Sequence, residues 1–293
     1  MKTSSKLSLF FIILVIITVT VIAIYINKNS RRELRHMAAR QYGIQQLMET
    51  KLVASAIEKY FDRFIFDLYF MAHTGRDLSS IPPSDELFYK RDKVLPKVTS
   101  IRFLDTKGLL TFIYPSDGFR GKLIGKRYHT EEYYKKALST GKIAISSFIY
   151  NEKNEPRIRI AIPVFENDPA IHRIKGVWVG SFDPITVLTT IITPIVPEKA
   201  VEYAWVLDSQ GCFLIHPVKE FIGKNSFGAR TKKNQAFSYE KIEKIQQKMI
   251  QGHEGTDTYT SGWHQDQKGY IEKFVAYSPA KIADSNWSVA ICP

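Results

Sequence analysis

A group of aromatic and charged residues between positions 131 and 182 has the side chains that a small-molecule pocket needs. Concave surfaces lined by aromatic rings, with a few charged groups among them, bind small molecules. Tyr133 and Tyr134 open a segment with helical spacing, and the strands expected after it supply further rings and two arginines. The candidate site residues are Glu131, Tyr133, Tyr134, Phe148, Tyr150, Arg157, Arg159 and Phe182.

The charged members of this group set the kind of ligand. If Glu131 points inward it would attract a cationic or amine ligand, and the tyrosine rings would add cation–π attraction. If Arg157 or Arg159 points inward, a carboxylate ligand fits instead. Purely structural explanations stay open for each. The two arginines share one face of the strand RIRIAI (157–162), which could face solvent. Glu131 could simply favour the dipole of a helix first turn, and the tyrosines could pack in the core.

Catalytic and metal-binding motifs are missing from the chain. It has no phosphate-binding loop, dinucleotide-binding glycine motif, zinc-protease motif or nucleophile elbow. One acidic and histidine-rich stretch has a spacing that matches no known metal-ligand pattern, and it reads as a polar hairpin loop: His253, Glu254, Asp257, His264 and Asp266. We therefore expect no enzyme activity, no cofactor and no metal site in these residues.

A repeated pattern predicts the elements that would position the site. LDTKGLLTFIYP (104–115) and LDSQGCFLIHP (207–217) each read as a β-hairpin with glycine in the turn, and LIGK (123–126) and FIGK (221–224) follow them in the same register. Each copy continues with a helical segment and three strands. The pattern predicts an α+β chain with two copies of one unit, each having an antiparallel five-stranded sheet. The first copy carries the aromatic pair, so the site belongs there.

The N-terminal residues have the composition of a membrane span. Residues 7–26 carry no charge and are long enough to cross a bilayer. The apolar core is longer than that of a signal peptide, which predicts an uncleaved transmembrane helix. Residues 30–75 have apolar side chains at helical spacing and no proline, so a long helix should continue from the span and end near Gly75 and Pro82-Pro83. Lysines and arginines flank the span on both sides, which leaves its orientation open.

Charge and cysteine content exclude further classes. The net charge of +12 comes from scattered lysines and arginines, which argues against a nucleic-acid partner and fits an anionic membrane surface or an acidic ligand. With only Cys212 and Cys292, a disulfide framework or four-cysteine zinc site is excluded. The two cysteines could form one disulfide or remain as buried free thiols.

The order of the motifs resembles the double Cache (dCache) sensor domains of bacterial and archaeal membrane receptors. The two hairpins, the two IGK motifs, EEYYKKALSTGK (131–142), IAIPVFE (160–166) and GVWVGSFD (176–183) carry this resemblance over about residues 30–293. It implies two tandem PAS-like units, of which the membrane-distal one binds a small ligand and the membrane-proximal one passes the signal on. Such receptors usually act as homodimers.

Comparison with the amino-acid-binding branch of that family narrows the ligand. The family motif is an arginine, one residue, Trp-Tyr, two residues and alanine. Setting Ala137 on the alanine puts Tyr133 and Tyr134 on the aromatic pair, but it puts Glu131 where the arginine should be. The strand carboxylates of the family would fall near Tyr150 and Phe182. We therefore expect a ligand other than an α-amino acid, and its identity stays open.

These observations predict an extracytoplasmic sensor module of a membrane receptor. We expect a transmembrane anchor at 1–29, a long signalling helix at 30–80, the distal ligand-binding unit at 81–198 and the proximal unit at 199–293. The partners would be a small-molecule ligand, the cell membrane and a second copy of the chain, with no nucleic acid. Any catalytic output domain would lie beyond residue 293. The alternative is a membrane-anchored extracytoplasmic interaction protein without a small-molecule ligand.

Overall fold

The structure of the chain is a computed structural model that describes residues 2–73, 98–115, 118–166, 173–196, 203–233, 238–264 and 267–292. The chain divides into two compact parts, Met1–Gln46 and Leu47–Pro293. Helix α1 (Lys2–His73) forms the first part and contributes its C-terminal turns to the second. The loop expected around Gly75 and Pro82-Pro83 lies outside the described residues.

Helix α1 confirms the long uninterrupted helix that the spacing predicts. Among the residues that the structure describes, no helix satisfies the length and hydropathy that a membrane crossing requires. The transmembrane helix expected at 7–26 therefore stays a prediction.

The first sheet has the strand order β2-β1-β6-β5-β3, with β4 also paired to β5 and all pairs antiparallel. Its strands are β1 (Val98–Asp105), β2 (Leu110–Tyr114), β3 (Ala144–Ile145), β4 (Ile149–Tyr150), β5 (Pro156–Phe165) and β6 (Ile174–Phe182). Its helices are α3 (Gly118–Gly121), α4 (Glu132–Thr140) and α5 (Pro184–Ile192).

The expectation of five strands is wrong for this sheet, which has six. Of the three strands expected after the helical segment, the first is divided into β3 and β4 at residues 144–150, and both pair with β5. The Ser146 hydroxyl accepts a hydrogen bond from the Arg159 backbone N–H at 2.9 Å. Because a side chain takes the place of a ladder carbonyl there, the regular strand is interrupted.

The second sheet has the strand order β8-β7-β11-β10-β9 and confirms the five antiparallel strands expected. Its strands are β7 (Tyr203–Leu207), β8 (Phe213–Ile215), β9 (Gly255–His264), β10 (Gln267–Ile282) and β11 (Ser285–Cys292). Between β8 and β9 lie the 3-10 helix η1 (Lys219–Phe221), α6 (Ser226–Lys233) and α7 (Glu240–Ile250). Cys212 and Cys292 are free thiols, so the alternative of a disulfide between them is excluded.

Equivalent hydrogen bonds confirm the repeat. Asp105 Oδ1 accepts the backbone N–H groups of residues 107 and 109, both at 2.8 Å, and Asp208 Oδ1 accepts those of residues 210 and 212 at 2.9 and 2.8 Å. The turn glycines have φ of 74° at Gly108 and 78° at Gly211, a conformation that glycine adopts without steric cost. Each IGK lysine carbonyl then accepts a backbone N–H from the hairpin's second strand. Two stretches with the same local chemistry thus build the same hairpin.

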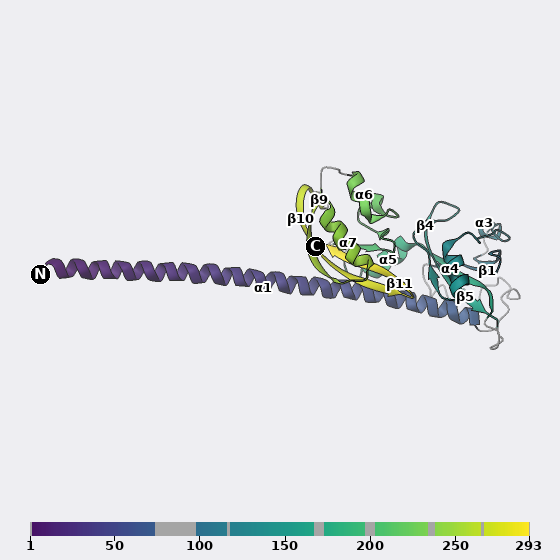
Figure 1. Cartoon of the computed structure of the whole chain (residues 1–293), viewed down its shortest axis with the longest axis horizontal. Helices are drawn as coiled ribbons and strands as arrows, with labels where there is room; N and C mark the ends of the chain where they lie inside the picture. The colour runs from purple at the N-terminus through teal and green to yellow at the C-terminus, as the bar shows by residue number, and fades with distance from the viewer. Residues whose placement is uncertain are drawn as a thin grey trace. The chain divides into compact units, whose positions relative to one another are not determined.

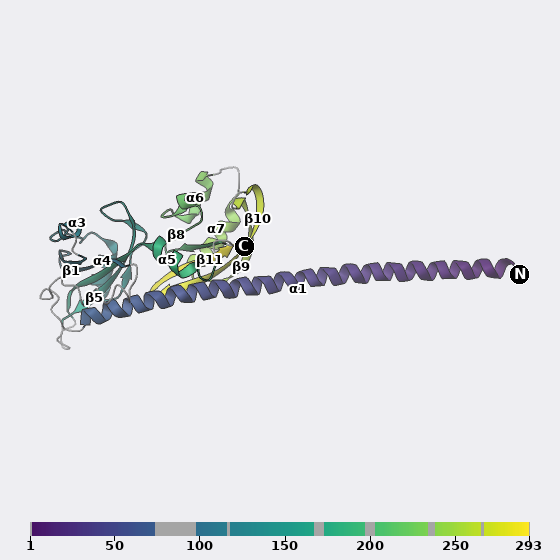
Figure 2. The same ribbon diagram turned by 180° about the vertical axis from the view of Figure 1, so that it is seen from behind.

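Helix α1 packs on one face of each sheet, and Figures 1 and 2 show its C-terminal turns running past both. Phe61 is fully buried, with its ring centroid 4.9 Å from that of Phe182 in β6 and 5.1 Å from that of Trp287 in β11. The approach is close because β6 has glycine below the helix. A Cβ at Gly180 would lie 2.2 Å from Cζ of Phe64. One helix therefore shares a hydrophobic core with two sheets.

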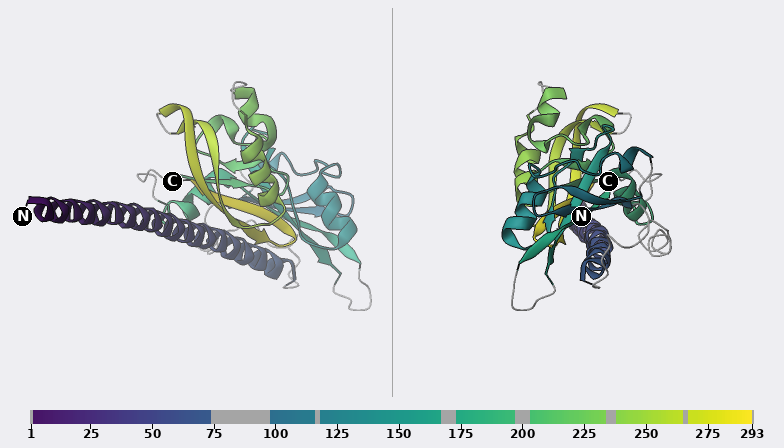
Figure 3. Two further views of the ribbon diagram at one scale, coloured as in Figure 1. Left: turned by 60° about the vertical axis from the view of Figure 1, so that its left-hand side comes forward. Right: turned by 90° about the vertical axis from the view of Figure 1, so that its right-hand side faces the viewer.

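The opposite face of each sheet is covered by its own helices. Helix α4 lies on the first sheet through Tyr133, Tyr134 and Ala137. Helix α7 lies on the second through Ile242, Ile245 and Met249, and Figure 3 shows it on the side of the strands away from α1. These helix-covered faces carry the polar side chains described next.

Candidate functional site

The face of the first sheet under α4 changes from apolar to polar along its strands. At one end it consists of aliphatic side chains, among them Leu104, Val177, Val179 and Ala161. At the other end it carries polar side chains, every one of which is at least nine-tenths buried: Ser100, Arg102, Ser146, Arg157, Arg159 and Ser181. Pairing of Ser181 with both Ser100 and Arg159 sets three of them in one row across β1, β6 and β5. Both faces of this sheet are covered by helices, and the strand side chains on such faces are normally apolar. A buried polar end is therefore unusual.

Arg159 is the best-enclosed charge of this polar end, with 3% of the residue exposed. Its Nη1 donates to the Tyr133 hydroxyl at 3.0 Å and lies 3.8 Å from Oε2 of Glu131. The guanidinium carbon stands 5.5 Å from the ring centroid of Tyr133 and 5.9 Å from that of Tyr128, within cation–π range. Its Nε is buried and has no hydrogen-bond partner. A buried donor without an acceptor costs free energy that a ligand oxygen would recover.

Arg102 on β1 repeats this situation on the other side of Tyr128. Its guanidinium carbon lies 5.4 Å from the Tyr128 ring centroid, and its Nη1 lies 3.6 Å from Oε1 of Glu152 without forming a hydrogen bond. The Tyr128 hydroxyl donates to the same Glu152 oxygen at 2.7 Å. Two arginines from neighbouring strands therefore converge on one tyrosine ring.

The electrostatics of the cluster follow from burial and from these pairs. Burial alone would raise the pKa of Glu152, but the Tyr128 hydrogen bond and the charges of Arg102 and Arg159 lower it to about 2. Burial raises the pKa of the Tyr133 hydroxyl. The tyrosine is therefore neutral and the glutamate charged at neutral pH. Two positive and two negative groups meet here, and donor atoms of both arginines still lack a hydrogen-bond acceptor.

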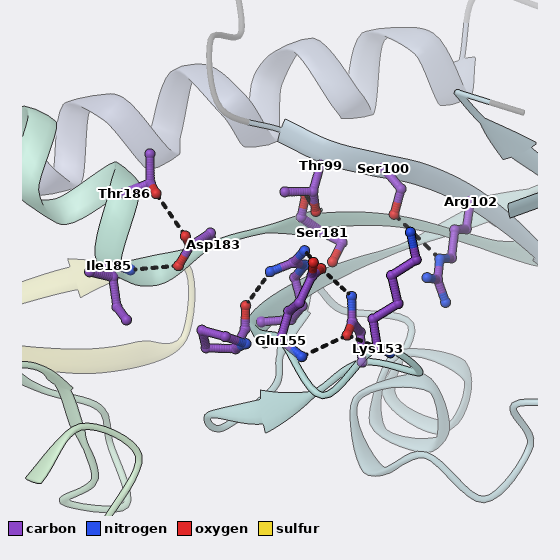
Figure 4. Close-up of polar contacts among 12 residues, drawn as sticks. Thr99, Ser100, Arg102, Lys153, Glu155, Ser181, Asp183, Ile185 and Thr186 are labelled. Atoms are coloured by element: carbon purple, nitrogen blue, oxygen red, sulfur yellow. Dashed lines mark hydrogen bonds and ion pairs between the residues drawn. The ribbon is translucent and has the colours of Figure 1, made fainter. Parts of the chain in front are cut away.

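The turn between β4 and β5 lies over the polar end, and Figure 4 shows Lys153 of this turn reaching toward Ser100 and Arg102. Arg157 is held by this turn: its Nη1 donates to the carbonyl oxygen of Pro156 at 2.6 Å, and its Nη2 contacts the Glu155 carboxylate. A cavity of about 360 Å³ opens beside it. The cavity is lined by Val98, Thr99, Glu155, Pro156, Arg157, Asp183 and Thr186. Its size falls within the range of small-molecule sites.

Comparison with known proteins now adds to this geometry. Residues 30–291 of the chain match the family described as Cache domain (dCache_1), which covers most of the chain. The chain belongs to the Cache domain family. No sequence among the curated proteins matches the chain.

Solved structures show the same Cache fold. An extracellular ligand-binding receptor from Desulfohalobium retbaense DSM5692 has a TM-score of 0.63 at 18% identity, over 85% of this chain and 40% of that one. The ligand-binding domain of the Pseudomonas aeruginosa PAO1 amino-acid chemoreceptor PctC, in complex with GABA, has 0.55 at 18%, over 83% and 96%. The periplasmic sensory domain of the Campylobacter jejuni chemoreceptor Tlp1 has 0.58 at 16%, over 87% and 95%. The chain thus spans less than half of the first receptor.

The first Cache sheet brings together Glu131, Tyr133 and Arg159 from the predicted set. Arg157 lies on the same face, so the alternative that both arginines face solvent is excluded by their burial. Tyr134 lies beside this group in the core, where its hydroxyl donates to the Asp105 carbonyl oxygen at 2.8 Å.

Three predicted residues lie elsewhere. Phe182 points to the opposite face, against Phe61 and Phe64 of α1, because it follows Ser181 and neighbours on a strand alternate between faces. Phe148 packs against Gly223, which lies between η1 and α6, and Tyr150 is 56% exposed. The structure does not bring these three rings to the arginine cluster.

Sequence reasoning also missed three members of the cluster, Arg102, Tyr128 and Glu152. Arg102 could have been predicted from the strand VTSIRFLD (98–105). It lies two residues after Ser100 and two before Leu104, so alternation puts the three side chains on one face. Tyr128 follows a turn, and Glu152 lies within one. In such segments no periodicity shows which side chains point inward.

Metal ligation has no support within the described part of the chain, where no three His, Cys, Asp or Glu side chains lie close enough to hold an ion. Asp257, from the acidic and histidine-rich stretch, instead lies 3.6 Å from Nζ of Lys241.

Proposed function

We propose that the chain is the extracytoplasmic sensor module of a membrane receptor and that it binds a small molecule on the polar end of the first Cache sheet. The buried guanidinium of Arg159 carries this proposal, because its Nε has no acceptor among the residues that the structure describes. A ligand oxygen placed there would complete the hydrogen bonding that the fold leaves open.

The ligand class follows from the unmet groups. Both unpartnered atoms, Arg159 Nε and Arg102 Nη1, are donors, so the ligand should present acceptor oxygens. A carboxylate matches the planar guanidinium and can accept two parallel hydrogen bonds from it. Tyr133 and Tyr128 supply rings for the remainder of the ligand. GABA, L-Arg and L-Gln, the ligands named for related chemoreceptor domains, all carry a carboxylate.

The structure also changes how the altered family motif is understood. Glu131 replaces the expected arginine, but Arg159 reaches the same place from the strand, 3.8 Å from the Glu131 carboxylate. A guanidinium and an acid are thus both present. The guanidinium comes from β5 and the acid from the residue that precedes α4. We propose a small organic carboxylate as the ligand. The binding screen described below compares amino acids with simple carboxylic acids.

Membrane attachment and pairing complete the proposed receptor. We propose a transmembrane anchor at 1–29, with the units 81–198 and 199–293 outside the cytoplasm as distal and proximal modules. Helix α1 leaves Met48, Leu52, Phe66 and Phe70 exposed, and these residues share one side of the helix by their spacing. A second copy of the chain would cover this stripe in a homodimer.

A thermal-shift screen of the purified chain in detergent tests ligand binding. The panel contains amino acids, simple carboxylates, amines and purines at equal ionic strength. A bound ligand stabilises the folded state by mass action, and we expect a carboxylate to raise the melting temperature.

Two variants locate the binding. Arg159→Gln should weaken it roughly tenfold or more, because it removes a charge-assisted hydrogen bond. Arg173→Gln, an exposed arginine just before β6, is the matched control and should bind normally. No shift across the panel, together with a co-purifying protein, would favour the interaction protein. Equal binding by both variants would place the ligand elsewhere.

A further inference from the structure

The second Cache sheet buries an arginine that no residue of the described chain neutralises. Arg230 lies on α6 and is 5% exposed. The helix is kinked at its start, where Phe227 and Gly228 leave helical geometry and Gly228 has φ of 85°. This left-handed residue redirects the chain. The following turn carries Arg230, whose guanidinium lies in the core between α6 and the sheet.

Aromatic rings surround this guanidinium. Its carbon lies 5.6 Å from the ring centroid of Trp205, 5.3 Å from that of Phe213 and 5.8 Å from that of Phe221. Its Nη1 is buried without a hydrogen-bond partner, and none of the described carboxylates forms an ion pair with it. Cation–π contacts recover part of the cost of burying the charge, but they satisfy no N–H donor.

A second buried cation enters the same core from β10. Lys273 is 2% exposed, and its Nζ donates to the Tyr203 hydroxyl at 2.7 Å. Burial lowers the pKa of Lys273 to about 8, and the charge of Arg230 acts in the same direction. The two cations are therefore close enough to repel each other. The Tyr259 hydroxyl and the Cys292 thiol, 3.6 Å apart, complete this polar group.

The repeat places this group where the first sheet has its own polar end. Asp105 and Asp208 begin equivalent turns, so counting along the paired strands matches Ser100 with Tyr203. In the same way the registers match Ser181 with Cys292 and Arg157 with Lys273. The first sheet balances its arginines with Glu131 and Glu152. In the second sheet, no described carboxylate forms an ion pair with Arg230, whose Nη1 stays without a partner.

We propose that the second Cache sheet holds its own small carboxylate, bound between Arg230 and Lys273. The planar anion would accept hydrogen bonds from Arg230 Nη1 and relieve the repulsion between the two cations. Its hydrocarbon part would lie against Trp205 and Phe213. The surrounding side chains are almost fully buried, so the acid must be short. This site is separate from the one under α4, and the proposal does not depend on that site being occupied.

Saturation-transfer NMR on the whole chain in detergent tests the second site, with acetate and propionate as probes and inorganic phosphate as the comparison anion. Unmodified protein is measured first, so the test does not depend on a variant that folds. We expect transfer to acetate or propionate, and a rise in melting temperature when they replace chloride at constant ionic strength.

Variants then assign the signal. Arg230→Gln should lower the affinity roughly tenfold or more, and Lys273→Met should lower it as well. Arg173→Gln, at an exposed arginine outside both clusters, is the control and should bind the short acids normally. Absence of binding by unmodified protein overturns the proposal, and so does binding of phosphate alone. Binding lost in Arg159→Gln but kept in Arg230→Gln also overturns it, while supporting the site on the first sheet.

Discussion

Replacing Phe61 by alanine removes a ring that contacts both sheets at once. Phe61 is fully buried, and its neighbours Phe182 and Trp287 come from β6 and β11. Truncation of a buried phenylalanine costs about 3–5 kcal/mol, because transfer energy is lost and a cavity remains. Three edge or tilted ring contacts, with Tyr60, Phe182 and Trp287, are lost here as well, which places the expected cost near the upper end, about 4–5 kcal/mol.

Urea denaturation measures this cost, and hydrogen exchange locates it. We expect faster exchange in peptides from β6 and in peptides from β11, since the missing ring served both sheets. Phe66→Ala on the same helix is the matched control: its ring is 61% exposed, so its effect should stay within about 0.5 kcal/mol. If Phe66 contributes to a dimer, its effect will vary with protein concentration, whereas that of Phe61 will not.

Two results would refute this reasoning. One is a cost for Phe61→Ala no greater than that of Phe66→Ala. The other is faster exchange confined to a single sheet, because the ring would then not join the two.

Two further predictions concern close packing and a buried charge. Gly180→Val should lose about 1–3 kcal/mol or more in urea denaturation, since even a Cβ there would lie 2.2 Å from Phe64; unchanged stability would mean that α1 does not rest on this glycine. Lys273 has its folded pKa lowered from 10.5 to about 8, so between these values the unfolded chain binds more protons and the stability rises with pH. Relative to Lys273→Met, the unmodified protein should gain about 3 kcal/mol from pH 8 to 10.5, and parallel stability curves would contradict the buried charge.

Local patterns predicted most of the fold. The two hairpins follow from an Asp that caps each turn and a Gly that adopts positive φ, both encoded within five residues. The helix that covers each sheet follows from its own periodicity. The division of 144–150 into two strands was not predictable, because it depends on a hydrogen bond between Ser146 and a residue thirteen positions away.

The site was predictable only in part, for a related reason. Alternation along β5 correctly put Arg157 and Arg159 on one face, but the sequence does not say that α4 covers that face. The same alternation, applied to β6, would have placed Phe182 on the side opposite Ser181. Glu152 joins the cluster through contacts with Arg102 and Tyr128, which are distant in sequence, and no local pattern encodes these contacts.

Between β3 and β4, the contact of Ser146 with Arg159 and the contact of Phe148 with Gly223 lie only two residues apart. Ser146 exchanges hydrogen bonds with the Arg159 backbone at 2.9 Å in both directions. Burial raises the pKa of the Asp208 carboxyl, and the backbone N–H of Phe148, two residues after Ser146, acts against this rise. A Cβ at Gly223 would lie 2.7 Å from the Phe148 ring. A three-residue segment thus touches the arginine site on one side and the segment between η1 and α6 on the other.

Any coupling through this short segment, between the site beside Arg159 and the contact of Phe148 with Gly223, must act equally in both directions. If occupancy beside Arg159 changes the free energy of the Phe148 contact, then any change at that contact must alter the affinity beside Arg159 by the same factor. Residues of the second hairpin would then tune the concentration range over which the first sheet responds, without touching its ligand. Sensitivity could therefore evolve at Gly223 or Asp208 while the chemistry that selects the ligand stays unchanged.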